Sequence, residues 1–283
     1  MSCDRVTVTF DPGKQLDPSQ VEDRRGGAVS GGPIVIGGGA IGLLLFVAAV
    51  LLGVDPFAGT APQAPVDSQQ TVEQCRTGAD ANNREECRVV GFVDSIQAYW
   101  SDDFARRGAS YAKAPTVLYS GYVQGACGLA SAAQGPFFCP LDDKVYLDVS
   151  FFQDLRSRFG AQGGSLAEGY VVAHEYGHHV EYLLGLLSND SSRQASIRTE
   201  LMADCLAGVW AKHATETGYL QSVTDADIAA ALDAAGAVGD DRIQRETQGR
   251  VTPETWTHGS SAQRQQSFRA GVTSGDVTTC TRA

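Results

Sequence analysis

Two histidines four residues apart, with a glutamate directly after the first, form the pattern His174-Glu175-Tyr176-Gly177-His178. On a helix, residues i and i+4 lie on one face, so both imidazoles would reach a single zinc ion. Glu175 lies about 100° round the helix, where its carboxylate can take a proton from a zinc-activated water without binding the ion. The alternative is a buried polar helix whose histidines have protein partners and bind no metal.

A catalytic zinc needs a third protein ligand and an open position. In the segment SIRTELMADCLAGVWAKHA, Glu200 and Asp204 lie one turn apart in an otherwise apolar helix. Burying two carboxylates is costly unless they are paired or bind metal. We therefore interpret Glu200 as the third ligand and Asp204 as the acceptor of a ring N–H from one ligand histidine. For Asp204 the alternative is an exposed polar stripe.

The other histidines and two tyrosines are sorted by the same geometry. His179 points about 100° away from His178 and is not expected at the same ion, and His213 lies on the opposite face of its helix from Asp204, in solvent. His258, in THGSSAQRQQSF, is either a donor to the substrate oxyanion or a structural turn residue. Tyr170 and Tyr182 are candidate donors or core residues.

Hydrophobic periodicity and local cues predict the elements that position these residues. Ser165 and Glu168 form a capping-box signature, so we expect the metal-ligand helix to run from Ser165 to about Gly185. We further expect a helix over 89–104, strands over 116–123 and 144–149, and mostly helices from 166 onward. Strands early and helices late predict an α+β fold, mostly helical with a small sheet.

Residues 34–54 are all apolar or glycine, a run of 21 residues, which predicts one transmembrane helix. The competing interpretation is a cleaved signal peptide, although its apolar region is ordinarily shorter. Arg24 and Arg25 precede the run and Asp55 follows it, so we expect the N-terminus in the cytoplasm. The predicted organisation is a cytoplasmic segment 1–33, a transmembrane helix 34–54, a proline-rich linker 55–70 and an extracytoplasmic domain 71–283.

Charge and cysteines agree with this division. The chain has 22 basic and 33 acidic residues; residues 1–33 hold 4 and 5 of them, which leaves 18 and 28, or −10, for the exported part. Such a balance argues against nucleic-acid binding.

Cys3 would be cytoplasmic and the other six cysteines exported. Six cysteines allow 15 pairings, and proximity favours Cys75 with Cys87, Cys127 with Cys139 and Cys205 with Cys280.

Several motifs together resemble a bacterial family called "putative neutral zinc metallopeptidase": VEDRRGG before the apolar run, GPFFCPLDDKVYLD, HEYGHHVE, ELMADCLAGVWA, GDDRIQ and THGSSAQR. The resemblance extends from Val21 to Cys280, while the first 20 residues do not resemble the family's usual N-terminus. It implies a membrane-anchored, zincin-like domain with His174, His178 and Glu200 as zinc ligands and Glu175 as the base. It does not identify a substrate.

In zincin-like enzymes an edge strand ahead of the metal-ligand helix pairs with an extended substrate. The segment KVYLDVSFF, with Tyr146 and Asp148, is the candidate here, and the alternative is an ordinary core strand. The leading hypothesis is a membrane-anchored, extracytoplasmic zinc endopeptidase acting on peptides or proteins. Its rival is a membrane-tethered binding or scaffold protein with a structural zinc or a lost hydrolase activity.

Overall fold

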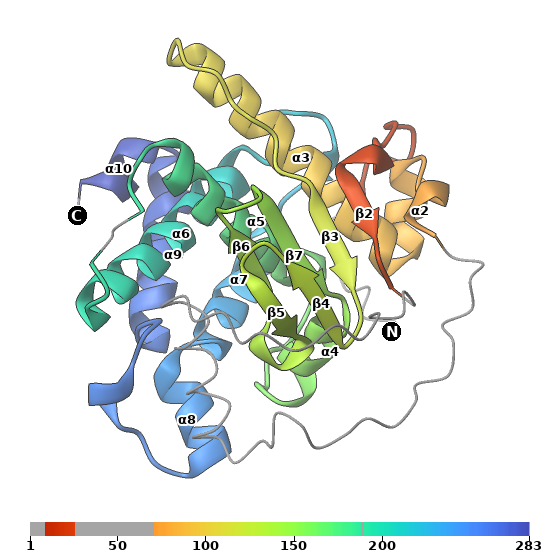
Figure 1. The fold of residues 1–283 in the computed structure, drawn as a ribbon. Coiled ribbons are helices and arrows are strands. Elements are labelled where there is room, and N and C mark those ends of the chain that lie inside the picture. The colour runs from red at the N-terminus through yellow and green to blue at the C-terminus, as the bar shows by residue number, and fades with distance from the viewer. Residues whose placement is uncertain (1–8, 26–70, 188–189, 283) are drawn as a thin grey trace.

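The computed structural model describes residues 9–25, 71–187 and 190–282. A four-stranded sheet of order β2-β3-β7-β6 lies beside a larger group of helices (Figure 1). The strands are β1 (Thr9–Phe10), β2 (Val21–Asp23), β3 (Thr116–Tyr119), β4 (Tyr122–Gly125), β5 (Gly128–Ser131), β6 (Phe137–Cys139), β7 (Lys144–Asp148) and β8 (Leu220–Ser222). The described chain is thus α+β, mostly helical with small sheets, as predicted.

The helices make up most of the rest. They are α2 (Gly78–Asn83), α3 (Glu85–Arg106), α4 (Ser150–Ser157), α5 (Ser165–Leu183), α6 (Arg193–His213), α7 (Asp225–Ala237), α8 (Asp240–Gln248), α9 (Ser261–Ser274) and α10 (Val277–Thr281). Short 3₁₀ helices lie at η1 (Pro18–Gln20), η2 (Val72–Gln74), η3 (Ala132–Gln134) and η4 (Pro253–Thr255). The helix predicted over 89–104 is longer by a turn at its start.

The sheet separates two apolar clusters because side chains alternate across a strand. Leu118, Val145 and Leu147 belong to the main core, which the helices fill. Val117 and Tyr146 face the other side, where they form a smaller cluster with residues of the antiparallel hairpin β4–β5. The strand expected over 116–123 is in fact β3 and β4, separated by the turn residue Gly121 with φ 75°.

Residues 9–25 belong to the same folded unit as residues 71–282. Strand β2 pairs in parallel with β3 (Figure 1), and β1 pairs with β8. Phe10 is buried against Phe92 of α3, with ring centroids 5.0 Å apart. Buried Asp94 accepts a hydrogen bond from the Asp17 backbone N–H at 2.7 Å. The predicted domain start near residue 71 is therefore wrong.

This packing bears on the expected membrane topology. The predicted transmembrane helix (34–54) and linker (55–70) lie outside the described residues. Among those described, no helix combines the length and hydropathy that a membrane span requires. A single crossing between residues 25 and 71 would put the paired strands β2 and β3 on opposite sides of the membrane. The cytoplasmic N-terminal segment and extracytoplasmic domain expected from the charges therefore do not agree with this fold.

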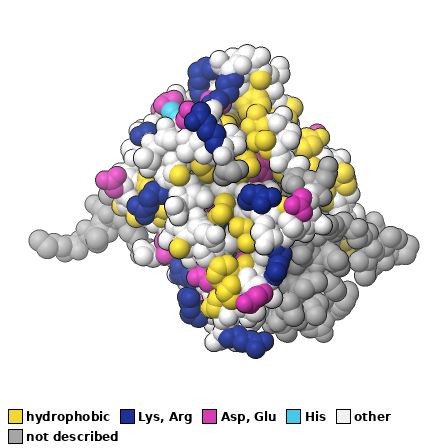
Figure 2. Space-filling model, turned by 90° about the vertical axis from the view of Figure 1, so that its left-hand side faces the viewer, with side chains coloured by type: hydrophobic (Ala, Val, Ile, Leu, Met, Phe, Trp, Pro, Cys, Tyr) yellow, Lys and Arg dark blue, Asp and Glu magenta, His cyan; other side chains and the backbone are white. Residues whose placement is uncertain are grey.

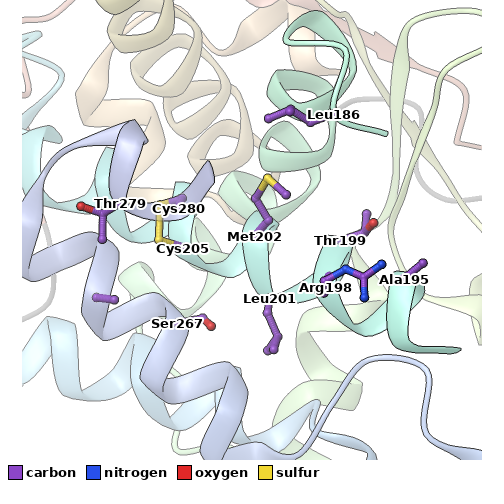
Figure 3. A pocket seen from close by; sticks show the side chains of 11 residues that line it. Leu186, Ala195, Arg198, Thr199, Leu201, Met202, Cys205, Ser267, Thr279 and Cys280 are labelled. Carbon is purple, nitrogen blue, oxygen red and sulfur yellow. A yellow bond between two sulfur atoms is a disulfide. The ribbon is translucent and has the colours of Figure 1, made fainter. Parts of the chain in front are cut away.

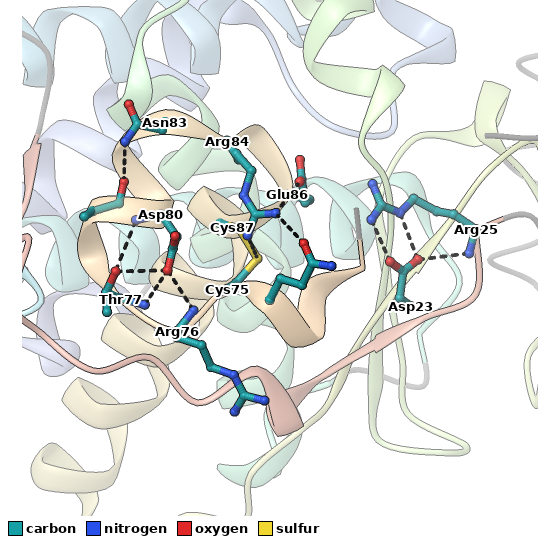
Figure 4. Close-up of a disulfide and its surroundings, with 12 residues drawn as sticks. Asp23, Arg25, Cys75, Arg76, Thr77, Asp80, Asn83, Arg84, Glu86 and Cys87 are labelled. Carbon is teal, nitrogen blue, oxygen red and sulfur yellow. Dashed lines mark hydrogen bonds and ion pairs between the residues drawn. A yellow bond between two sulfur atoms is a disulfide. The ribbon is translucent and has the colours of Figure 1, made fainter. Parts of the chain in front are cut away.

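All three predicted disulfides are confirmed. Cys75 is joined to Cys87, Cys127 to Cys139 and Cys205 to Cys280. The first lies beside the capping box of α2, in which the Thr77 hydroxyl accepts the Asp80 backbone N–H and the Asp80 carboxylate accepts the Thr77 backbone N–H (Figure 4). The second ties the β4–β5 turn to β6, and the third ties α10 to α6.

Candidate metal centre

Helices α5 and α6 carry the predicted metal ligands and pack directly on each other. Their close approach depends on Gly177, because a Cβ atom there would lie 2.8 Å from the Ala203 carbonyl oxygen. The predicted capping box at the start of α5 is absent. Gly164, at φ 119°, is the N-cap and makes no side-chain cap bond. Glu168 instead pairs with Arg88 and Arg156, since these cations compensate its buried carboxylate.

The three predicted ligands meet at one place. One nitrogen each of His174 and His178 and one carboxylate oxygen of Glu200 lie within 4.8 Å of one another. The Glu200 carboxylate is 3.2 Å from His174 Nε2 and 3.7 Å from His178 Nε2. Two imidazoles and one carboxylate are a known donor set of catalytic zinc sites. Within the described residues, the cluster includes no fourth His, Cys, Asp or Glu.

Each ligand histidine has its own carboxylate partner at Nδ1, which leaves Nε2 for an ion. His174 Nδ1 lies 2.8 Å from Asp204 Oδ1, and Asp204 is fully buried, so the predicted role of Asp204 is in place. His178 Nδ1 lies 2.9 Å from Glu181 Oε2 on the same helix. Such partners fix the tautomer and orientation of a ligand histidine. The donor set therefore fits a zinc ion.

The pKa values of the candidate ligands also support a metal site. Burial lowers the pKa of His174, but Asp204 and Glu200 outweigh it and raise the pKa to about 10. Burial would raise the pKa of Glu200, yet His258 and the two ligand histidines bring it well below the usual range. The lowered pKa of Glu200 reports the positive charge of the histidines, and the raised pKa of His174 reports the negative charge of the carboxylates around its imidazole. A divalent cation would neutralise this charge in place of the histidine protons.

Glu175 is adjacent to the cluster without belonging to it. The residue is 7% exposed, and burial raises the pKa of its carboxyl although the neighbouring histidines lower it. A carboxylate whose pKa is raised toward neutrality is a better proton acceptor near pH 7 than an exposed one. It lies outside the set of three side chains that could hold a metal ion.

His258 approaches the centre from the loop before α9. Asp240 at the start of α8 accepts the backbone N–H groups of Thr257, His258 and Gly259 at 2.7–3.0 Å. Its other oxygen lies 3.1 Å from His258 Nδ1. Burial lowers the pKa of His258, but Glu200 and Asp240 raise it overall. The charge of Glu200 therefore acts on this imidazole, which stays outside the set of three candidate ligands.

The remaining candidates do not belong to the set of three candidate ligands among the described residues. His179 packs against Tyr111 and Phe138 and stays outside the ligand set, as predicted. His213 is not free in solvent, because it stacks on Tyr99 and Nδ1 lies 2.7 Å from Glu216. Tyr170 is buried and donates to Asp204, so it is a core residue rather than a donor to substrate. Tyr182, 39% exposed, packs against Phe138.

The predicted substrate strand is wrong. Strand β7 pairs with β3 on one side and β6 on the other, so it has no free edge. Tyr146 and Asp148 are both buried. Tyr146 donates its hydroxyl to Asp142, and Asp148 accepts the N–H groups of Gly121 and Ser150. The alternative of a core strand holds, and the free edge near α5 belongs to β6.

A cavity of about 240 Å³ lies on another face of α6 (Figure 3). Arg198 and Met202 line it, with Leu186 and the Cys205–Cys280 disulfide. Both α6 residues are two positions from Glu200, hence about 200° round the helix, so the cavity is not part of the metal centre. The side of the molecule carrying α6, α9 and α10 shows basic and acidic side chains interspersed rather than one patch of a single sign (Figure 2).

Three residues of the centre were missed from the sequence. Glu181 had a usable signal, because it lies three residues after His178 on the same helix face. Asp240 and Arg264 lie in the motifs GDDRIQ and THGSSAQR, but no local spacing relates them to the ligands, since they reach the site only through the packing of α8 and α9. Arg264 is 4% exposed and donates Nε and a terminal nitrogen to the two oxygens of Asp204, at 2.8 and 2.9 Å.

Comparisons with known proteins identify the family of this chain. The uncharacterized protein Rv2575 of Mycobacterium tuberculosis is 49% identical over 250 residues, which cover 82% of this chain and 84% of that protein. The uncharacterized protein YpfJ of Escherichia coli K12 is 37% identical over 281 residues, which cover 93% and 95%. No solved structure matches. The profile of the family described as "Putative neutral zinc metallopeptidase" matches residues 13–282, and the chain belongs to that family.

Proposed function

We propose that this protein is a zinc-dependent endopeptidase of zincin-like organisation. One observation carries the proposal: two imidazole nitrogens and the Glu200 carboxylate converge, while the buried carboxylate of Glu175 lies beside them and outside the set. Three protein ligands leave an open position, as in catalytic zinc sites, whereas a structural site ordinarily has four. Zinc would supply Lewis acidity and lower the pKa of water at that open position.

The chain's own residues then have separate tasks. Asp204 and Glu181 hold the rings of His174 and His178 in orientation. Glu175 accepts the proton of the attacking water and passes it to the leaving amine. His258, whose Nδ1 lies 3.1 Å from Asp240, donates a hydrogen bond to the carbonyl oxygen as negative charge develops there.

The substrate strand is reassigned to β6. This strand pairs with only β7 among the described strands, and so leaves one edge for an added peptide. Phe138 of β6 packs against His179 and Tyr182 of α5, next to the ligand His178. Backbone pairing recognises an extended peptide whatever its sequence, so this edge supports peptides or proteins as the substrate class.

The compartment is part of the proposal. Three disulfides within one domain favour an oxidising environment, and we place the folded unit outside the cytoplasm. Because residues 9–25 belong to that unit, they lie on the same side of any membrane as residues 71–282. The apolar run at 34–54 is the candidate for membrane contact.

The test uses the full chain loaded with zinc and a library of peptides. Glu175→Gln should retain one zinc per chain and lose about 10²- to 10⁴-fold in cleavage rate. Glu246→Gln, which makes the same change at an exposed position of α8, should cleave as the native chain does. Equal cleavage by native chain and Glu175→Gln at equal zinc content would refute the assigned role of Glu175.

A further inference from the structure

Arg264 lies at the point where four helices meet behind the metal centre. It projects from α9, and its guanidinium donates to Asp204 of α6, to the Tyr170 hydroxyl of α5 at 3.1 Å and to the Val238 carbonyl after α7 at 3.1 Å. The ribbon shows α9 beside α6 and α7 (Figure 1). None of these contacts involves substrate, and the side chain is 4% exposed.

Arg264 makes a bidentate contact with the Asp204 carboxylate. Nε lies 2.8 Å from Oδ2 and a terminal nitrogen 2.9 Å from Oδ1. A fork of this kind fixes the plane of a carboxylate, which a lysine ammonium cannot do. Tyr170 donates to the same Oδ1 at 2.5 Å. The carboxylate is thus held by two buried donors, and the terminal nitrogen of Arg264 also lies 3.4 Å from His174 Nε2 and 3.9 Å from Glu200 Oε2.

Oδ1 is also the atom that faces the ligand histidine. His174 Nδ1 lies 2.8 Å from it, so the plane of the carboxylate determines where the imidazole points. The terminal nitrogen of Arg264 itself lies 3.3 Å from His174 Nδ1. The second ligand histidine differs: the described contacts of Glu181 include His178 but no arginine, and one Glu181 oxygen is buried without a partner.

We propose that Arg264 is a positioning residue for the metal centre: it clamps Asp204 so that Asp204 holds His174 in the orientation that binds zinc. The proposal rests on the metal centre of the proposed function and adds a residue to it. Loss of such an outer contact ordinarily lowers metal affinity by about 10- to 100-fold. The expected consequence of Arg264→Met is a loss of that order in zinc affinity.

The experiment measures the zinc dissociation constant of the full chain by competition with a chromophoric chelator. Arg264→Lys is measured alongside Arg264→Met. It keeps the positive charge, so it still tests the proposal if Arg264→Met does not fold. Arg88→Met is the matched control: it breaks the pair between Arg88 of α3 and Glu168 of α5, the helix that also carries His174, and the described contacts of Arg88 include no candidate ligand. We expect weaker zinc binding for both Arg264 variants and native affinity for Arg88→Met.

A purely structural role would give a different pattern. If Arg264 acts through Asp204, Arg264→Met combined with Asp204→Asn should bind zinc no more weakly than Asp204→Asn alone. The visible spectrum of bound Co²⁺ should change in both Arg264 variants and not in Arg88→Met. Native affinity and spectrum in the Arg264 variants, or the same loss in Arg88→Met, would overturn the proposal. Failure of the native chain to bind zinc would instead overturn the proposed function.

Discussion

Gly177 of α5 lies against the backbone of Ala203 in α6, and a Cβ atom at position 177 would be 2.8 Å from the Ala203 carbonyl oxygen and 2.9 Å from its Cα. Gly177→Ala should therefore push the two metal-ligand helices apart. We expect a loss of about 1–3 kcal/mol in unfolding free energy and a lower zinc affinity, since Glu200 moves away from the histidines. Denaturant titration and chelator competition measure the two effects.

Gly169→Ala is the matched control for that variant. A Cβ there would meet the ring of Phe92, 2.7 Å away, on α3 rather than on α6. It should destabilise the fold without changing the zinc dissociation constant. Equal zinc affinity in Gly177→Ala and the native chain would show that the spacing of α5 and α6 does not control the site.

The N-terminal segment should be required for folding. Phe10 is 1% exposed, and its backbone N–H and carbonyl both bond to the Asn82 side chain, at 2.9 and 3.0 Å. Phe10→Ala should cost about 3–5 kcal/mol of unfolding free energy because it removes a buried ring. Gln15→Ala, at an exposed position of the same segment, should cost almost nothing. Equal melting temperatures for the two variants would contradict the packing of residues 9–25.

Residues 9–25 and 71–282 should lie in one compartment, because their strands pair. In a chain carrying Cys3→Ser, single cysteines are introduced at exposed Gln15 and exposed Glu246. A membrane-impermeant maleimide applied to intact cells should label both positions to the same extent. If Glu246→Cys is labelled while Gln15→Cys is protected until the cells are permeabilised, the two segments lie on opposite sides of the membrane. That result would contradict this prediction and support the single crossing expected from the charges.

Asp94 should make stability depend on pH. Burial raises its pKa to about 7 from the ordinary aspartate value of 3.8, so the folded chain holds a proton that the unfolded chain releases. The resulting stabilisation is full below about pH 4 and is lost as the pH rises through 7. In metal-free protein, Asp94→Asn should flatten the fall in melting temperature between pH 5 and pH 8. If the melting temperature of Asp94→Asn falls as much as that of the native chain, Asp94 is not the source of the pH dependence.

The predictable part of the centre is the part encoded locally. His174, Glu175 and His178 share one helix, and Glu200 and Asp204 share another, so helical spacing predicted their relation correctly. Arg264 and Asp240 were not predictable, because no local pattern brings α8 and α9 to the site.

The sheet illustrates the same limit. The alternation of Lys144–Asp148 predicted a strand correctly but not its place in the sheet, which depends on pairing with β3 and β6. Strand β2 has three residues, too few for a periodic signal, and its pairing with β3 spans more than ninety residues of chain. Such pairing between distant segments determines which strand of the sheet has a free edge and where the folded domain begins.

The central claim is that His174, His178 and Glu200 hold one zinc ion with an open position. A crystal structure of the zinc-loaded full chain, with anomalous scattering recorded at the zinc edge, tests it most directly. The account predicts a single anomalous peak bound by these three side chains and by water, with Glu175 beside the water and outside the ligand set. A fourth protein ligand in place of water, or a peak away from these residues, would contradict it.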